Sequence, residues 1–179
     1  MDSLFDGTDV TQPEQACEAR NQKVVLLPVS KRHSAETPLA PSPERMAELL
    51  QNAGYKGYVI EDEYRRFVES SAEGWKFRVY FYGEHAKDTG DRFNSFMFTS
   101  GWSLQQEDIA NALNSANIFN VRFRYLKAYV VSGDDYAYTE AEMSQFCPDG
   151  VSDYQFISFL EMFINLRQSY VTIFRETGK

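Results

Sequence analysis

The chain has 179 residues, of which 43% are hydrophobic and 15% aromatic, enough for one domain core with an appended segment. Its formal net charge is -8 and its pI is about 4.8, so its overall field repels nucleic-acid backbones and anionic lipid surfaces. The two cysteines, Cys17 and Cys147, offer neither a disulfide framework nor zinc-site spacing, and the N-terminus lacks a secretory signal. We therefore expect a cytoplasmic protein that binds no membrane and for which nucleic acid is an unlikely partner.

The first part of the chain differs in composition from the rest. Five of the six prolines lie within the first 43 residues, and Phe5 is the only aromatic residue there. Such a segment cannot bury enough apolar surface to offset its ordering entropy. We predict a proline-rich, largely flexible leader over residues 1–42, with a possible edge strand at 23–29, followed by one domain over 43–176. Pro28 is compatible with an edge strand but not with a central one.

The domain begins with a predicted helix. Ser42 is suited to the N-cap and Pro43 to the first helical position, while Gly54 favours the end of the helix. The predicted buried stripe of this helix comprises Met46, Leu49, Leu50 and Ala53.

Four strands are predicted next, over residues 57–61, 65–71, 75–83 and 92–100. The third alternates clearly, with Trp75, Phe77, Val79 and Phe81 on one face and Lys76, Arg78, Tyr80 and Tyr82 on the other. A period of two with one apolar face indicates a half-buried antiparallel strand. Residues 84–91 are predicted to form the loop between the last two strands.

A second helix is predicted from a capping box at Ser103 and Gln106 to about Asn120, burying Ile109, Ala112, Leu113, Ala116 and either Ile118 or Phe119. A hairpin follows, with strands at 125–132 and 136–144 around the turn 133–135. A second box at Ser152 and Gln155 begins a long helix that runs to about Arg175. Its predicted buried stripe comprises Phe156, Phe159, Leu160, Phe163, Leu166, Val171 and Phe174.

The predicted order is α-β-β-β-β-α-β-β-α. Strands joined by hairpin-length connections indicate an antiparallel sheet with helices packed against it, so we predict the α+β class.

The order and several segments together resemble the YbjN-domain family, whose members are described as bacterial sensory transduction regulators. The resemblance is carried by residues 49–55, 75–83, 96–103, 125–143 and 149–156. It implies a fold like that of type III secretion chaperones, with no enzymatic activity, no cofactor and no catalytic residues. It also implies protein binding and a possible homodimer.

The potentially reactive side chains do not form a recognisable catalytic or metal-binding motif in the sequence. Cys147 and His85 are the nearest to a nucleophile and base, but they lie on separate loops without a glycine-rich oxyanion turn. The acidic residues Asp62, Glu63, Glu84, Asp88 and Asp91 lack calcium-loop spacing, and no phosphate-binding loop is present. We therefore predict no catalytic, cofactor-binding or metal-binding residues.

The candidate functional feature is surplus aromatic and basic surface. Tyr80 and Tyr82 lie opposite the apolar face of their strand, and tyrosine is favoured at interfaces because it buries a ring and keeps a polar hydroxyl. The alternative is that they are covered within the monomer. The predicted protein interface comprises Arg78, Tyr80, Tyr82, Arg122, Arg124 and Tyr129.

We predict a non-catalytic regulatory or chaperone-like module that binds an unidentified protein or a second copy of itself. The alternative is a nucleic-acid-associated regulator, because the basic-aromatic stretch from Arg122 to Tyr129, with Lys76 and Arg78, could hold phosphates and stack on bases. A third possibility is a small-molecule sensor or enzyme with a pocket between sheet and helix.

Overall fold

The computed structural model describes residues 23–25, 38–83, 85–86, 90–91 and 93–178. The sheet strands are β1 (Lys23–Val25), β2 (Tyr58–Glu61), β3 (Arg66–Ala72), β4 (Trp75–Tyr82), β7 (Ser95–Ser103), β8 (Lys127–Ser132) and β9 (Ala137–Phe146). The helices are α2 (Pro43–Asn52), α3 (Ile109–Arg122) and α4 (Asp153–Thr177), with a 3-10 turn at Gln106–Asp108 before α3. Two short strands, β5 (His85–Ala86) and β6 (Gly90–Asp91), pair with each other in the segment that was predicted to be a loop.

The described residues form a seven-stranded sheet in the order β1-β2-β3-β4-β7-β9-β8. Each neighbouring pair in that sheet is antiparallel. From residue 43 onward the main elements follow the predicted order, which confirms the α+β class. β1 pairs with β2 at one edge of the sheet, although the boundary between leader and domain stays a prediction.

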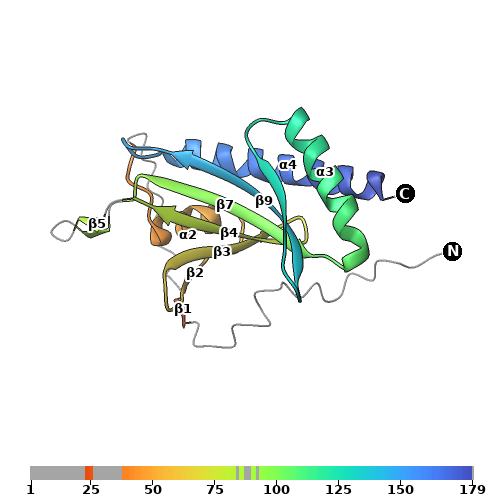
Figure 1. The fold of residues 1–179 in the computed structure, drawn as a ribbon. Coiled ribbons are helices and arrows are strands. Elements are labelled where there is room, and N and C mark those ends of the chain that lie inside the picture. Colours follow the sequence, from red (N-terminus) through yellow and green to blue (C-terminus); the bar gives the residue numbers. More distant parts are fainter. Residues whose placement is uncertain (1–22, 26–37, 84, 87–89, 92, 179) are drawn as a thin grey trace.

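Helices α2, α3 and α4 share one hydrophobic core with a single face of the sheet. In Figure 1, the long helix α4 crosses behind the strands and α3 lies beside it. The centre of the core is a cluster of phenylalanine rings in which Phe98 stacks on Phe163 at 5.3 Å and contacts Phe96 and Phe156 at 5.5 and 5.6 Å between centroids. The apolar face predicted for residues 75–81 points into this core.

Local capping signals explain where α2 and α4 begin. The Ser42 hydroxyl accepts a hydrogen bond from the backbone N–H of Arg45, with Pro43 at the first helical position. At α4, Ser152 accepts from the backbone of Gln155 and the Gln155 side chain accepts from the backbone of Ser152. Both predicted N-caps are therefore confirmed, because in each helix the serine hydroxyl accepts a hydrogen bond from a backbone N–H of the first turn.

Replacing Ser152 with alanine should lower the free energy of unfolding by about 1 kcal/mol, because the backbone N–H of Gln155 loses its acceptor, the Ser152 hydroxyl. The matched control is Ser169→Ala, since the exposed Ser169 hydroxyl donates only to the carbonyl of Asn165. Urea unfolding of both variants measures the difference, and equal values would contradict the capping argument.

The predicted capping box at Ser103 is wrong. Ser103 is the last residue of β7, where it pairs with Tyr138 of β9, and α3 begins only at Ile109. Pairing between β7 and β9 outweighs the local capping signal at Ser103, because it extends a pair of strands that is already formed. The stripe on α3 is also shifted: Leu113, predicted to be buried, is 48% exposed, whereas Ser115 is buried beside Ala112, Ala116 and Phe119. In the same way Ala53, predicted to be buried, is the exposed C-cap of α2.

The β8 edge of the sheet is partly occupied by a side chain of α3. The Asn120 amide donates to the carbonyl of Ala128 at 2.8 Å and accepts from its N–H at 2.9 Å. A single asparagine thus bonds to β8 as a neighbouring strand would, which protects an edge that could otherwise pair with another chain.

Asn120→Ala should destabilise the fold by about 1 to 2 kcal/mol, because two backbone groups of Ala128 lose their partner. It should also increase aggregation on heating, since the strand edge is then open. The control is Asn117→Ala, at an exposed position on the same helix. Thermal unfolding followed by light scattering compares the two variants, and identical behaviour would exclude the protective role.

Candidate functional site

The second face of the sheet is the candidate site, and we call it the outer face. Among the described residues, none of the helices lies on it, because α2, α3 and α4 all pack on the opposite face. Side chains alternate along each strand, so the cross-strand neighbours of Arg78 and Tyr80 share this face with them. Its central residues lie on β3 (Phe67, Glu69), β4 (Lys76, Arg78, Tyr80, Tyr82), β7 (Ser95, Met97, Thr99, Gly101), β9 (Tyr138, Glu140, Glu142, Phe146) and β8 (Lys127, Tyr129).

A small apolar cluster lies on the outer face near β2 and β3. It consists of Ile60, Phe67 and Tyr80, with Tyr58 and Met97 packed against it. The guanidinium of Arg65 lies 4.1 Å from the centre of the Tyr80 ring, and Tyr80 is only 6% exposed. Neighbouring side chains of the same sheet therefore cover this ring without the help of a helix.

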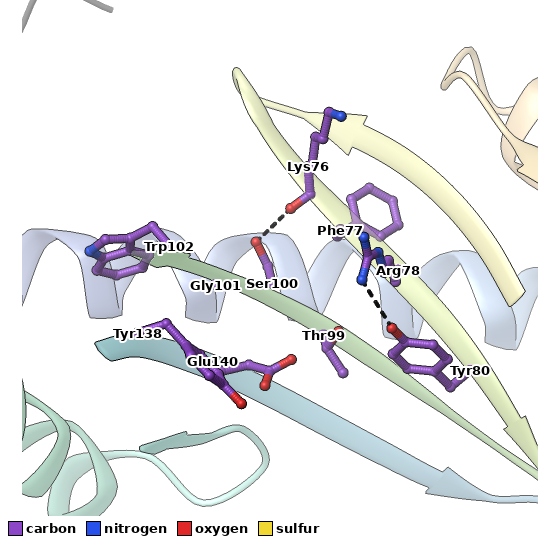
Figure 2. Close-up of a pocket in the computed structure, with 10 residues that line it drawn as sticks. All are labelled: Lys76, Phe77, Arg78, Tyr80, Thr99, Ser100, Gly101, Trp102, Tyr138 and Glu140. Atoms are coloured by element: carbon purple, nitrogen blue, oxygen red, sulfur yellow. Dashed lines mark hydrogen bonds between the residues drawn. The ribbon is translucent and has the colours of Figure 1, made fainter. Parts of the chain in front are cut away.

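A shallow hollow runs over β4, β7 and β9 on this face (Figure 2). In this view Lys76, Arg78 and Tyr80 come from one side, Thr99 and Gly101 lie along the middle, and Tyr138 and Glu140 come from the other side. The Arg78 guanidinium donates to the Tyr80 hydroxyl at 3.4 Å. The hollow measures about 60 Å³, far below the roughly 300 Å³ at which pockets for drug-sized ligands begin. Its size favours a contact surface over a small-molecule pocket.

Charge is distributed unevenly across the hollow. On the β4 side, Glu69 forms ion pairs with Arg78 at 3.5 Å and with Lys76 at 3.7 Å. On the β9 side, the Tyr129 hydroxyl donates to Glu140 at 2.9 Å and to Glu142 at 3.3 Å. Burial, followed by these two carboxylates, raises the pKa of Tyr129 well above its usual value, so the phenol stays protonated. The Tyr129 phenol thereby holds the two carboxylates together.

Gly101 keeps the middle of the hollow free of side chains. A Cβ built at this position would lie 2.4 Å from the carbonyl oxygen of Thr139 and 3.2 Å from the Cα of Glu140. Because these are backbone atoms of the neighbouring strand, neither can move away cheaply. Glycine is therefore required for β7 and β9 to approach as closely as they do.

The structure brings four of the six predicted interface residues onto one face. Arg78, Tyr80, Tyr82 and Tyr129 share the outer face; Tyr80 is buried there and Tyr82 is 45% exposed. Arg122 and Arg124 are exposed, but they lie at the connection between α3 and β8 and are not among the paired residues of the sheet.

Sequence reasoning missed the acidic side and the far aromatic residue of this face, Glu140, Glu142 and Phe146. Their alternation along β9 was visible, but their alignment with Arg78 and Tyr82 depends on the order of strands in space.

In the described part of the chain, the side chains considered for catalysis or metal binding do not form a reactive group. Cys147 is a buried free thiol, and burial raises its pKa, which disfavours the nucleophilic thiolate. The side chain of His85 lies outside the described residues, as do those of Glu84, Asp88 and Asp91. Asp62 accepts hydrogen bonds from the N–H groups of Tyr64 and Arg65 and so forms the β2–β3 turn. In the described part of the chain, histidine, cysteine and carboxylate side chains do not gather into a potential metal site.

The helices of the described ranges are too short or too polar to cross a membrane.

Comparison with known proteins supports both the fold and the family. The model of the YbjN family, described as "Putative bacterial sensory transduction regulator", matches residues 42–176. A solved structure titled "Crystal structure of YbjN, a putative transcription regulator from E. coli" superposes with a TM-score of 0.60 at 12% identity, covering 79% of this chain and 96% of that one. An uncharacterized protein from Methanothermobacter thermautotrophicus has a TM-score of 0.51 at 16% identity, covering 74% and 96%. At these identities the two structures establish a shared fold. Among curated proteins, none matches this chain in sequence.

Proposed function

Because the chain belongs to the YbjN family of bacterial sensory transduction regulators, we propose that it is a cytoplasmic, non-catalytic regulatory module that works by binding protein through its outer face. The observation that carries the proposal is a sheet face that no described helix covers and that combines a central hollow with exposed aromatic residues. Tyr82 is 45% and Phe146 is 66% exposed, and both flank Ser95 of β7 in one cross-strand row. Aromatic residues of this kind are enriched where proteins bind each other.

We favour binding by surface complementarity of this face over strand addition at the β8 edge. The side-chain bonds of Asn120 occupy the backbone groups of Ala128 at the β8 edge. The outer face, in contrast, presents charged side chains of both signs at its centre. Such a pattern gives specificity and orientation to an interface. A chaperone-like role would use the same surface, since binding a client requires an exposed apolar and charged face.

The test is photo-crosslinking in the native cell. A crosslinking phenylalanine analogue replaces Tyr82 on the outer face, and a matched protein carries it in place of Tyr154, which is 82% exposed at the start of α4. Position 82 should give discrete protein adducts, either with a second copy or with a different protein, and position 154 should not. Equal labelling from both positions, or none from position 82, would overturn the proposal.

A nucleic-acid role is the second candidate, because Arg122, Arg124 and Tyr125 are exposed together and the E. coli relative of the same fold is titled a transcription regulator. The rest of the stretch argues against it: Lys127 and Tyr129 lie beside the carboxylates of Glu140 and Glu142, which repel phosphates. We expect no salt-dependent retention on single-stranded DNA at low salt. Retention that Arg122→Glu abolishes would support the nucleic-acid role instead.

A further inference from the structure

The two edges of the sheet are covered in different ways. At the β8 edge, the Asn120 side chain bonds to the backbone of Ala128. At the opposite edge, β1 (Lys23–Val25) pairs with β2 (Figure 1). The family model matches residues 42–176, so β1 comes from outside the segment that this chain shares with the family. The cover of β2 is therefore an addition to the family segment, and without it β2 would be the edge strand of the sheet.

The strand β2 is apolar on both of its faces. Val59 has no exposed surface and belongs to the main core, whereas Ile60 is 5% exposed and packs on the outer face with Phe67 and Tyr80. Charged residues protect many edge strands from pairing with other chains, but the only charged residue of β2 is Glu61, at its end. The backbone N–H and C=O groups along this edge therefore favour pairing with an extended chain.

The strand β1 is a small cover on a fixed tether. It pairs three residues with β2, whereas β2 pairs four with β3 and β3 pairs five with β4. The chain is fixed again at Leu39, which exchanges two backbone hydrogen bonds with Val151, and Arg45 donates to the carbonyls of both residues. A strand with so few pairs can open while the rest of the sheet stays folded. The attachment at Leu39 keeps β1 at a high effective concentration near β2.

We propose that the β2 edge is a docking site for an extended segment of a different protein, and that β1 is the internal competitor that occupies it. This goes beyond the proposed function, because the site is the edge of the sheet and not its outer face. The partner's segment would replace β1 as the neighbour of β2, with affinity supplied by main-chain hydrogen bonds.

The surroundings of β2 define the chemistry of that segment. Successive side chains of a strand point to opposite faces, so the partner's residues lie beside Val59 on one face and beside Ile60 on the other. Both neighbours are apolar, and the segment must therefore be apolar on both faces, with β-branched residues favoured. The leader itself carries such a run, KVVLL, over residues 23–27.

Competition by β1 makes partner binding adjustable. The apparent affinity of the edge for a partner is its intrinsic affinity multiplied by the fraction of molecules in which β1 is open. Any change that weakens the pairing of β1 with β2 therefore strengthens binding of the partner. The leader thus sets the concentration at which a partner can dock.

The experiment is an NMR titration of the isotope-labelled full chain with a synthetic peptide of residues 21–29, which stands in for the partner's segment. The double variant Val24→Pro/Val25→Pro removes an N–H group directed at β2, because successive residues of a strand direct their N–H groups to opposite edges. In this variant the peptide should shift the amide signals of Tyr58–Glu61 with a dissociation constant at least about tenfold lower than in wild type, since β1 no longer competes.

Matched controls separate competition from other effects. The variant Asp9→Pro/Val10→Pro changes the leader outside β1 and should bind the peptide as weakly as wild type. A peptide with proline at positions 24 and 25 should bind neither protein. Equal binding to wild type and to the β1 variant, no binding to either, or shifts confined to other strands would overturn the proposal.

The amide signals of β7 and β9 report on the fold of the β1 variant. They should stay unchanged, because β1 contacts neither strand in the sheet order. Their loss would also overturn the proposal, since β1 would then be required for folding and could not be displaced. Crosslinking from position 82 reports on the outer face and is independent of this result.

Discussion

Replacing Phe98 with alanine should lower the free energy of unfolding by about 3 to 5 kcal/mol, the largest effect expected of any single change considered for this protein. Phe98 has no exposed surface, and its ring contacts Phe77, Phe96, Phe156 and Phe163. These contacts join β4 and β7 to α4, so the cavity cannot be closed by a local shift of one side chain. Urea unfolding followed by near-ultraviolet circular dichroism measures the loss.

Two further variants serve as comparisons for Phe98→Ala. Phe98→Leu keeps most of the volume and should cost roughly 1 kcal/mol, whereas Tyr154→Ala removes an 82% exposed ring and should stay within about 0.5 kcal/mol of wild type. A loss below about 1 kcal/mol for Phe98→Ala would mean that the phenylalanine cluster is not the centre of the core.

Arg167→Met should raise the stability of the protein by about 1 to 3 kcal/mol, the second large effect. Arg167 lies on α4 with no exposed surface, and one nitrogen donates to the carbonyl of Ala72 at 3.2 Å. Among the described residues, its Nε and Nη1 atoms have no hydrogen-bond partner. Its guanidinium carbon lies 5.9 Å from the centre of the Trp75 ring. With so few partners, the buried guanidinium does not recover the hydration free energy that it loses on folding.

The pKa of Arg167 identifies the origin of this cost. Burial lowers the pKa to about 10, and Glu73 only partly opposes the shift. A base whose folded pKa is lowered is penalised fully below that pKa, because the unfolded chain holds the proton more tightly. The penalty falls as the pH rises above about 10. The advantage of Arg167→Met should therefore be complete at neutral pH and shrink in strongly alkaline solution.

Unfolding at neutral and at alkaline pH measures this dependence. Arg175→Met, at an exposed arginine on the same helix, is the control and should change stability by less than about 0.5 kcal/mol. If Arg167→Met instead destabilised the protein by more than about 2 kcal/mol, the bond to Ala72 and the contact with Trp75 would outweigh the desolvation cost.

The buried arginine also marks a limit of reading a helix from its sequence. The apolar spacing on α4 predicted Phe156, Phe163 and Val171 correctly as buried, but Arg167 and Tyr170 lie in the same core. The β3–β4 turn explains the first of these, since Glu73 and Gly74 adopt positive φ angles of 53° and 79° and the preceding carbonyl of Ala72 bonds to Arg167. Nothing in the sequence of α4 itself indicates that a turn about 95 residues earlier supplies this partner.

The order of the main elements, the caps of α2 and α4, and the two faces of β4 could be predicted from the amino-acid sequence alone. These depend on interactions within a few residues or on strict alternation, both of which can be read along the chain. The family could also be identified from the sequence, because the segments that resemble it follow one another in a fixed order.

Which strands are neighbours in the sheet, and therefore which side chains share the outer face, depends on the folded chain and could not be predicted from the sequence. Ser103 remains in β7 because β9 pairs with it, and Tyr80 is buried because Phe67 and Ile60 lie beside it. The alignment of Arg78 with Thr99 and Glu142 arises from three strands that are distant in sequence. Cross-strand register is set by packing on the shared core, so this pattern of charge exists in space and not along the chain.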